Sequence, residues 1–326
     1  MNAVFTPGTR ISVSVPATSA NLGPGYDSLG IALDLRDELH VEVLEPGSTS
    51  LIVVSGEGAG TLPDDETHLV LKTLRIALSR AGVEGGGDIA LKLRCSNLIP
   101  HSRGLGSSAA AVVSGIAAAS ALLESAGEAG LDADAQLALA TELEGHPDNA
   151  APALRGGATV SWLDDDGAAH AAPLTVSPDI GFVVVIPAMR LSTEAARGLI
   201  PETVSHRVAA SNSARTALLV HALASDPRLL LAGTEDFLHQ EFRRPAMRYS
   251  LELVDALRAE NLAAVVSGAG PTVLVMSAEP ELADRVQRVL GLLDERWSAT
   301  GGEPSVPRTT VRSLRLADAG ARCLAG

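Results

Sequence analysis

The sequence predicts an α+β protein built from two domains. Short apolar runs typical of strands occur in pairs between longer segments with helical spacing, and this pattern indicates an α+β architecture. The chain has 326 residues, a length that suggests about two domains of about 150 residues each. We expect the boundary near residues 155–175 and draw it between an N-terminal domain at 1–165 and a C-terminal domain at 166–326.

The elements expected in the first half follow from alternation, helical spacing and turn residues. Residues 11–15 alternate as far as Pro16, which predicts a short strand and then a loop at 17–28. Further strands are expected at 39–44 and 89–93. One helix begins at Asp64 or Asp65 and ends at Gly82, and a second follows Ser108. Their apolar faces are Val70, Leu74, Ala77, Leu78 and Ala81 in the first helix and Val112, Val113, Ile116 and Leu123 in the second.

The second half is predicted in the same way. Asp132 caps a helix that runs to Glu144 and ends at Gly145-His146-Pro147. A hairpin at 160–163 and 168–174 turns at three aspartates and a glycine, and a buried strand follows at 182–186. The remaining expected elements are helices at 193–199 and 204–223, a strand-turn-strand unit at 263–276, a Gly/Pro-rich loop at 298–307 and a last strand from Thr309.

Composition excludes several classes of partner. The net charge is −14 and aromatic residues make up 2% of the chain, which argues against nucleic acid and anionic membranes. Cys95 and Cys323 fit no metal or redox spacing, so we expect reduced thiols in a cytoplasmic protein. Residues 1–10 lack the apolar core of a signal peptide. The alanine-rich run after Ser108 is interrupted by Ser114 and is expected to be too mixed to span a bilayer.

A glycine-rich turn between a strand and a helix predicts an anion site. Residues 100–110 read P-H-S-R-G-L-G-S-S-A-A. Gly104 and Gly106 permit a tight turn close to a ligand, and Ser107 and Ser108 lie where unpaired N–H groups and the helix dipole favour a phosphate. A serine hydroxyl there can also ligate a metal ion carried on the phosphate. The alternative interpretation is a turn with two helix-capping serines.

Three further segments carry more polar and glycine residues than a scaffold requires. They read P-A-T-S-A-N-L-G-P-G-Y-D at 16–27, E-L-E-G-H-P-D-N at 142–149 and S-G-A-G-P-T at 267–272. Together with the glycine-rich turn they resemble the superfamily of galactokinase, homoserine kinase, mevalonate kinase and phosphomevalonate kinase (GHMP). Within it, residues 15–33 and 144–157 are similar to the homoserine kinases, and the resemblance runs from about Ile11 to the last strand.

This resemblance implies a two-domain GHMP-kinase fold. The N-terminal, ATP-binding domain would be ribosomal-protein-S5-like and the C-terminal domain ferredoxin-like. The implied reaction is ATP-dependent phosphorylation of the side-chain hydroxyl of L-homoserine to O-phospho-L-homoserine, a step of threonine biosynthesis. The alternatives are another small-alcohol kinase of this fold, of the mevalonate or diphosphocytidyl-methylerythritol type, and a non-catalytic metabolite sensor.

The resemblance also implies where ATP and Mg²⁺ bind. The expected ATP-binding residues are Pro100, His101, Ser102, Arg103, Gly104, Leu105, Gly106, Ser107, Ser108 and Ala109. Mg²⁺ would be held by Ser108 and by a glutamate from the helix before the His-x-Asp-Asn segment. Glu142 is the first choice. Glu144 is kept as the second, because the spacing to that segment varies within the family and the two glutamates lie on different faces of the helix.

The implied substrate site matches each group of homoserine to a side chain. Asp27 receives the ammonium, while Arg197 and Arg243 hold the carboxylate, which a guanidinium can bind with two parallel hydrogen bonds. Asn21 and Asn149 orient the hydroxyl; the supporting residues are His146, Asp148, Thr193 and Gly268. At Arg243 the chain departs from the family, which usually shows a proline-aromatic-arginine triplet where this chain has Glu241-Phe242-Arg243.

The expected mechanism relies on positioning rather than on a general base. Asn149 ends the segment in which some relatives place a catalytic aspartate, and an amide takes no proton at neutral pH. Asp148 is adjacent, but sequence neighbours need not point the same way. We therefore expect positioning and charge stabilisation, which suit phosphoryl transfer, with Asn21, Asn149, Asp148, Ser108 and Glu142 as the catalytic set. The Ala- and Leu-rich helices permit a homodimer without requiring one.

Overall fold

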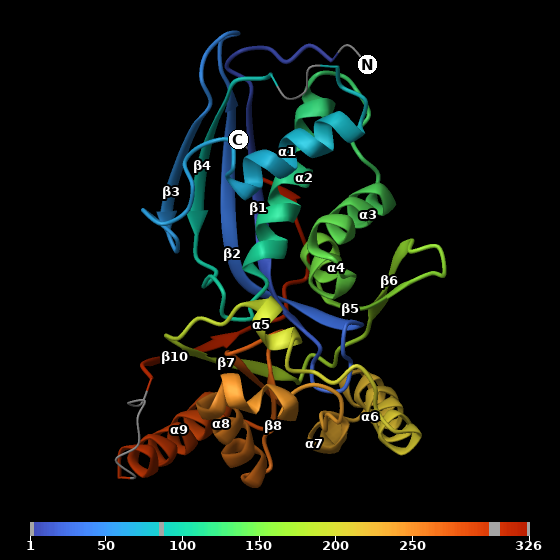
Figure 1. Cartoon of the computed structure of the whole chain (residues 1–326), viewed down its shortest axis with the longest axis vertical. Coiled ribbons are helices and arrows are strands. Elements are labelled where there is room, and N and C mark those ends of the chain that lie inside the picture. Colours follow the sequence, from blue (N-terminus) through green and yellow to red (C-terminus); the bar gives the residue numbers. More distant parts are fainter. Residues whose placement is uncertain (1–2, 85–87, 300–306, 325–326) are drawn as a thin grey trace.

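The chain folds around two β-sheets that are stacked end to end along the long axis of the molecule (Figure 1). The computed structural model describes residues 3–84, 88–299 and 307–324. The last short strand of the chain pairs with the first, so both belong to the first sheet. The mixture of antiparallel sheets and helices confirms the α+β prediction.

The first sheet has the strand order β11-β1-β2-β4-β3. A β5–β6 hairpin extends this sheet, because β5 pairs with the first residues of β2. All its described pairs are antiparallel except β3 with β4. Helices cover one face of this sheet, and α2 lies centrally against β1. The elements are β1 (Arg10–Ala20), β2 (Leu29–Val43), β3 (Leu51–Gly56), α1 (Leu69–Arg80), β4 (Leu91–Asn97), α2 (Ser107–Ser125), α3 (Ala133–Glu144), α4 (Pro147–Arg155), β5 (Ala158–Leu163), β6 (Ala169–Leu174) and β11 (Arg322–Cys323).

The second sheet has the order β10-β7-β9-β8, and all its pairs are antiparallel. Counted within the sheet this is order 4-1-3-2, with α8 and α9 as the two crossover helices of a ferredoxin-like unit. The elements are β7 (Gly181–Pro187), α5 (Thr193–Arg197), α6 (His206–Ala224), η1 (Pro227–Leu229), α7 (Leu230–Gly233), η2 (Glu241–Ala246), α8 (Arg248–Ala259), β8 (Ala263–Val266), β9 (Val273–Ser277), α9 (Leu282–Ala299) and β10 (Thr309–Leu314).

The side chains of β7 point alternately into the two hydrophobic cores, so this strand packs against both halves of the molecule. Phe182, Val184 and Ile186 belong to the large core cluster of the first sheet, whereas Val183 and Val185 pack with the side chains of α8 and α9. Successive strand residues point to opposite faces, so the second sheet is covered on both sides. By sheet membership β6 and β11 belong with the first sheet, although both lie beyond residue 165. The division at 165/166 stays a prediction.

Several predicted elements are confirmed. Asp132 caps α3 by accepting a hydrogen bond from the Ala135 amide, and α2 begins at Ser107 and buries its four predicted apolar residues. The β5–β6 hairpin, β7, the β8–turn–β9 unit and β10 also occupy their predicted places within a few residues.

Other expectations are wrong at the element ends. β1 continues through Pro16 to Ala20, because a shift of register after Pro16 accommodates a residue that lacks an N–H. β2 begins at Leu29 rather than at residue 39. His68 precedes α1, while the Asp65 carboxylate instead accepts hydrogen bonds from Thr67 in a turn ahead of the helix.

Some elements were not predicted at all. Pro147, which is predicted to end a helix, instead occupies the first turn of α4, a position that favours proline. The elements β3, η1, α7, η2, α8, α9 and β11 were also not predicted. The predicted loop at 298–307 overlaps the last two residues of α9, and most of it lies outside the described residues.

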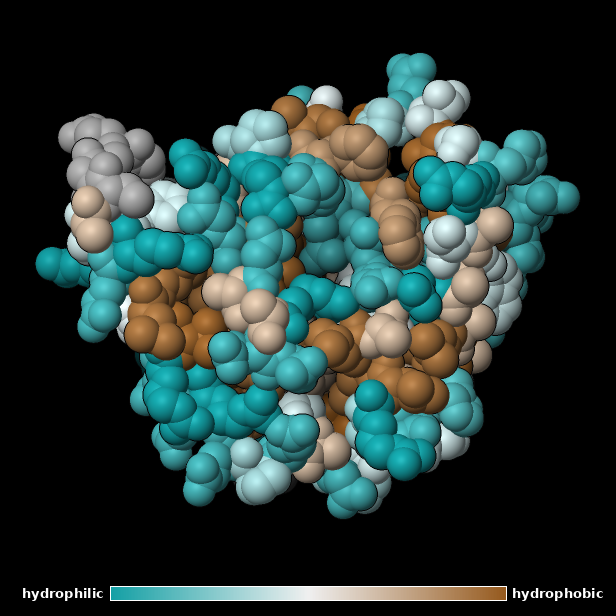
Figure 2. Space-filling model, turned by 90° about the horizontal axis from the view of Figure 1, so that it is seen from below, coloured by the Kyte–Doolittle hydropathy of each residue, from teal (hydrophilic) through white to brown (hydrophobic). Residues whose placement is uncertain are grey.

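Helix α2 is long and apolar enough, by length and composition alone, to cross a membrane, so the expectation that it is too mixed is wrong. Most of its residues are buried in the protein, and it packs against β1, α1 and α3. A core helix passes the same test, and burial identifies α2 as one. Seen from the end that carries α6 to α9, hydrophobic and hydrophilic areas are interspersed over the surface (Figure 2).

Candidate active site

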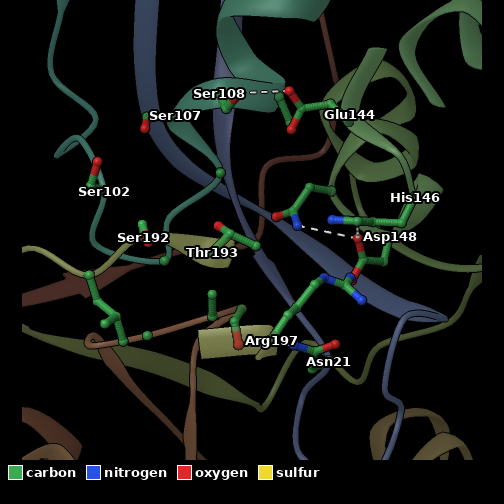
Figure 3. A pocket seen from close by; sticks show the side chains of 18 of the residues that line it. Asn21, Ser102, Ser107, Ser108, Glu144, His146, Asp148, Ser192, Thr193 and Arg197 are labelled. Carbon is green, nitrogen blue, oxygen red and sulfur yellow. Dashed lines mark hydrogen bonds and ion pairs between the residues drawn. The ribbon is translucent and has the colours of Figure 1, made fainter. Parts of the chain in front are cut away.

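The candidate site is a cavity of about 410 Å³ where loops from both halves of the molecule meet. Its walls come from the loop after β1, the start of α2, the α3–α4 junction, α5 and the turn between β8 and β9. Figure 3 shows Ser107 and Ser108 at the start of α2, with Glu144, His146 and Asp148 on the neighbouring helices. Arg197 and Thr193 approach from α5.

The glycine-rich turn has a conformation that only its two glycines permit. Gly104 and Gly106 have φ of 77° and 66°, in the left-handed region. A Cβ on Gly104 would lie 2.2 Å from the Ser267 carbonyl oxygen, and one on Gly106 would lie 1.9 Å from the Thr18 hydroxyl. The glycines therefore make room for neighbouring protein atoms, and both also line the cavity.

The serines that follow are the first two residues of α2 and do not cap it. Gly106 occupies the N-cap position, and no side chain caps this helix end. The N–H groups of the first turn have no partner within the helix, and Ser107 and Ser108 line the cavity. This arrangement favours the phosphate interpretation over the capping one.

The turn is held in place from both sheets. On β2, the Asp37 carboxylate accepts hydrogen bonds from the amides of Leu98 and Ile99, at 2.7 and 2.9 Å, just before the turn. Burial raises the pKa of Asp37 to about 6. Arg103 donates to the Pro187 and Ala188 carbonyls at the end of β7, both at 3.1 Å. These contacts fix the turn relative to both halves of the molecule.

Ser108 donates a 2.6 Å hydrogen bond to Glu144, the second choice of the sequence analysis (Figure 3). Glu142, the first choice, does not line the cavity. Its carboxylate pairs instead with Arg80 at 2.9 Å, and both side chains are more than half exposed. Because the two glutamates lie on different faces of α3, only Glu144 faces the start of α2, and the assignment of Glu142 is corrected.

Ser108 and Glu144 form a donor set that fits Mg²⁺. Burial raises the pKa of Glu144, and the hydrogen bond from Ser108 partly offsets this increase. A nearby cation would lower the pKa further and favour the ionised carboxylate. Mg²⁺ is commonly held by one or two protein oxygens, together with substrate phosphates and water. Among the described residues no cluster of three or more His, Cys, Asp or Glu could hold a metal ion, and the two-residue set suits a metal that arrives on a phosphate.

The loop after β1 carries an unusual backbone that places Asp27 in the cavity. Asn21 and Asp27 have φ of 71° and 54°, which asparagine and aspartate tolerate better than most residues. The Asn21 side chain donates to the Gly268 carbonyl at 2.9 Å and accepts from the Asp27 amide at 3.0 Å. The Asn21 side chain therefore forms both hydrogen bonds with protein atoms and holds the loop against the β8–β9 turn.

Asp27 and Arg197 present an anion and a cation side by side. The guanidinium donates to both Asp27 oxygens, at 3.0 and 2.7 Å, and to the Tyr26 hydroxyl at 3.0 Å. Both side chains are about one-third exposed and line the cavity. The two-pronged geometry is the one that a guanidinium offers to a carboxylate.

Arg243 is almost fully buried, with 1% of its surface exposed, yet it lines the same cavity. Its Nε donates to the Ala196 carbonyl at 3.3 Å, and Nη1 donates to the Gly268 carbonyl at 3.0 Å and to His239 Nδ1 at 3.1 Å. Burial lowers its pKa. A buried guanidinium that opens on a cavity is suited to bind an anion.

The start of α4 contributes a histidine–aspartate pair and an asparagine. His146 Nδ1 is in a short hydrogen bond with the Asp148 carboxylate, which raises the pKa of His146. Asn149 donates to the same carboxylate oxygen at 3.3 Å and accepts from the Thr18 hydroxyl at 2.7 Å. Asp148 is thus buried and already partnered, and Asn149 connects α4 to β1.

The structure brings most predicted site residues together. All nine predicted substrate residues line the cavity: Asn21, Asp27, His146, Asp148, Asn149, Thr193, Arg197, Arg243 and Gly268. So do six of the predicted ATP residues: Ser102, Gly104, Gly106, Ser107, Ser108 and Ala109. Pro100, His101, Arg103 and Leu105 do not, since Leu105 belongs to the core and Arg103 reaches the second sheet.

Several lining residues were not predicted individually. Leu143, Ala269 and Gly270 lie in segments that the sequence singles out, whereas Leu191 and Ser192 lie outside them. Ser192 carried a usable signal, because Ser-Thr-Glu before a helical segment is an N-cap signature and the Ser192 hydroxyl does cap α5. Thr18 supports the site through Asn149, but nothing in its local sequence distinguishes it from the other hydroxyls of β1.

Comparisons with known proteins agree with this geometry. Residues 68–157 match the family model of the GHMP kinases N-terminal domain, and residues 218–292 match that of the GHMP kinases C-terminal. A homoserine kinase of Streptomyces avermitilis is 50% identical over 289 residues, 89% of this chain and 91% of that protein. One of Mycolicibacterium smegmatis is 49% identical over 288 residues, 86% of this chain and 89% of that protein.

Solved structures show the same fold at lower identity. A homoserine kinase from Cytophaga hutchinsonii superposes with a TM-score of 0.80 at 23% identity, covering 99% of this chain and 100% of that one. A mevalonate diphosphate decarboxylase from Staphylococcus aureus gives a TM-score of 0.68 at 15% identity, with 97% and 98% covered. The two-domain architecture is therefore shared with proteins of different activity.

Proposed function

Because this chain belongs to the GHMP kinase family, we infer that it transfers the γ-phosphate of ATP to the side-chain hydroxyl of L-homoserine. The product is O-phospho-L-homoserine, an intermediate of threonine biosynthesis. One observation supports this most directly: the start of α2 with its Ser108–Glu144 pair and the charged side chains of Asp27, Arg197 and Arg243 line a single cavity.

The phosphates of ATP lie against the start of α2 in this proposal. The first-turn N–H groups and the positive end of the helix dipole stabilise negative charge there. Ser108 and Glu144 would hold Mg²⁺, which would supply positive charge beside the phosphates. The glycines of the turn keep Ser267 and Thr18 close behind it, so the turn approaches the phosphates as a rigid surface.

The amino-acid part of homoserine is recognised by complementary charges. Asp27 binds the ammonium, and Arg197 and Arg243 bind the carboxylate. The Asp27–Arg197 pair already places opposite charges next to each other, as a zwitterion with both charges on one carbon requires. Mevalonate has a carboxylate but no ammonium, so this set favours an amino acid over the alternative alcohols.

The geometry supports transfer without a general base. Asp148 accepts hydrogen bonds from His146 and Asn149, so its carboxylate is engaged in holding these side chains. Asn149 connects α4 to Thr18 of β1. Asn149 and the His146–Asp148 pair orient the substrate hydroxyl, while the start of α2 and the arginines compensate charge. This combination suits a loose phosphoryl-transfer transition state.

We also propose a cytoplasmic location with neither nucleic acid nor membrane as a partner. The net charge of −14 opposes binding to polyanions, and α2 is a core helix. Cys95 and Cys323 are free, and burial raises the pKa of the Cys95 thiol to about 12, which makes it unreactive. A homodimer is compatible with the apolar patches of the surface (Figure 2).

Turnover with purified protein tests the proposed function. ATP consumption is measured with L-homoserine, with mevalonate and with a cytidine-linked polyol at equal concentrations. We expect turnover with homoserine to exceed that with the other two acceptors. Faster turnover of either alternative would refute the substrate assignment, and no turnover with any acceptor would favour a sensor.

A further inference from the structure

A buried histidine lies directly behind Arg243 and is not part of the cavity wall. His239 has no exposed surface and precedes Arg243 by four residues. Its Nε2 is 2.8 Å from the Gly23 carbonyl oxygen, and its Nδ1 is 3.1 Å from Arg243 Nη1. The ring therefore connects the loop after β1 to the arginine.

These two partners determine the protonation of the ring. A carbonyl oxygen only accepts, so Nε2 must carry a hydrogen and donate it to Gly23. A guanidinium only donates, so Nδ1 must be unprotonated to accept from Arg243. Both bonds form together only when His239 is neutral with its hydrogen on Nε2. Burial lowers the pKa of His239, which agrees with a neutral ring.

The surroundings hold the ring and the arginine in this arrangement. The buried Asp236 carboxylate accepts hydrogen bonds from the amides of Leu238, His239 and Gln240 and so fixes the backbone that carries the ring. One of its oxygens lies 3.6 Å from His239 Nε2, which is compatible with a hydrogen on that nitrogen. The Tyr26 ring packs against His239 at 5.2 Å between centroids, and the Arg243 guanidinium lies 5.9 Å from the Tyr26 ring centre.

With these contacts, the orientation of Arg243 is determined by three acceptors. The hydrogens of Nη1 are shared between His239 Nδ1 and the Gly268 carbonyl, and that of Nε goes to the Ala196 carbonyl. Among the residues that the structure describes, none accepts a hydrogen bond from Nη2. Its two hydrogens are left for a ligand in the cavity that Arg243 lines.

We propose that His239 is a positioning residue for carboxylate recognition: as a neutral imidazole it accepts a hydrogen bond from Arg243 and orients the guanidinium toward the bound amino acid. This rests on the proposed function, in which Arg243 binds the carboxylate of homoserine. The role belongs to the Nδ1 acceptor, whereas the bond from Nε2 to Gly23 fixes the tautomer that provides this acceptor.

Two substitutions separate the two ring nitrogens. In His239→Gln the amide nitrogen can replace Nε2 as the donor to Gly23, but the acceptor for Arg243 is lost. In His239→Asn the amide oxygen takes the place of Nδ1 as the acceptor, but the donor to Gly23 is lost. Homoserine KM, ATP KM, kcat and the thermal unfolding transition are measured for both variants and for wild type.

We expect His239→Gln to raise homoserine KM about tenfold, the effect of losing one hydrogen bond to a charged group. ATP KM should stay within about twofold in the same variant. His239→Asn should keep homoserine KM within about threefold of wild type, since it preserves the acceptor. Equal increases in the two variants, an unchanged homoserine KM in His239→Gln or a parallel rise in ATP KM would overturn the proposal. Loss of cooperative unfolding in either variant would also overturn it, by assigning His239 to stability alone.

The double variant with Arg243→Gln distinguishes this proposal from the proposed function. If His239 acts through Arg243, His239→Gln should raise homoserine KM no further in the Arg243→Gln background, because coupled residues are not additive. A further full tenfold rise would overturn the positioning role. An unchanged homoserine KM in Arg243→Gln alone would instead show that Arg243 does not bind the carboxylate, whatever His239 does.

Discussion

Replacing Glu144 by glutamine removes the carboxylate that accepts a hydrogen bond from Ser108 at the start of α2. Glutamine keeps the size and one oxygen of the side chain but loses its charge. The oxygen can still accept the hydrogen bond from Ser108, which is 2.6 Å long in the native protein. The change therefore tests the charge at this position rather than the packing.

The size of the effect follows from the loss of one negative charge at the proposed metal site. Two unit charges about 4 Å apart interact by about 4 kcal/mol at an effective dielectric constant of about 20. The neutral amide oxygen and water recover part of this energy at a metal ion. We expect kcat/KM to fall at least about 100-fold, equivalent to about 2.7 kcal/mol, and the Mg²⁺ concentration for half-maximal rate to rise.

The same substitution should leave the protein folded. Because burial raises the pKa of Glu144, its contribution to stability is present below the unfolded-state pKa and is lost as pH rises through the folded-state pKa. At neutral pH the free energy of unfolding of Glu144→Gln, measured without metal, should therefore equal or exceed that of wild type. Reduced activity without reduced stability is the expected signature.

Glu142→Gln is the matched control, because it makes the same chemical change two residues away. Glu142 is more than half exposed and pairs with Arg80 on the surface, and surface pairs contribute at most about 1 kcal/mol to stability. Its kcat/KM and Mg²⁺ dependence should stay within about twofold of wild type, measured by initial rates over a range of Mg²⁺ and ATP. Normal activity in Glu144→Gln, with loss in Glu142→Gln, would refute the assignment.

Three further outcomes are expected. Arg197→Lys should raise homoserine KM about tenfold or more while ATP KM changes less than about twofold, since lysine cannot form the two-pronged contact; an unchanged homoserine KM would place Arg197 outside the substrate site. Burial raises the pKa of Asp37 to about 6, so the wild-type protein loses stability as pH rises from about 4 to 6 and Asp37 ionises. The unfolding free energy of Asp37→Asn relative to wild type should therefore increase by about 2 kcal/mol between pH 4 and pH 7. A difference independent of pH in denaturant titrations would contradict this. The single-turnover rate of wild type should be nearly flat between about pH 6 and 8; a tenfold rise per pH unit that disappears in Asp148→Asn would instead establish Asp148 as a general base.

The predictions from sequence were most successful where one local signal decides the structure. Asp132 caps α3, the aspartate-rich turn closes the β5–β6 hairpin, and the glycine-rich turn leads into α2. They failed where a local signal was ambiguous. Pro147 can end one helix or begin the next, and only the path of the chain after Gly145 shows that it begins α4.

For the site, the sequence predicts which residues line the cavity better than it predicts which side chains these residues contact. The motifs identify Asp27, Arg197 and Arg243, but not that the first two pair with each other or that His239 supports the third. The choice between Glu142 and Glu144 depends on the rotation of α3 relative to α2, which no local spacing encodes. Thr18 and Asp37 act through contacts with residues 131 and 61 positions away, and such long-range contacts leave no local pattern.

The way in which the glycine-rich turn is anchored connects the fold to the mechanism. The first sheet holds the turn through Asp37, while the second sheet holds it through Arg103 and through a 2.5 Å hydrogen bond from Ser267 to the Gly104 carbonyl. The β8–β9 turn that contains Ser267 also contains Gly268, whose carbonyl accepts from Asn21 and Arg243. A single turn of the second sheet therefore contacts both the proposed phosphate site and the proposed amino-acid site. A reaction without a general base depends on holding donor and acceptor at a fixed separation, and this shared turn provides a direct structural basis for that separation.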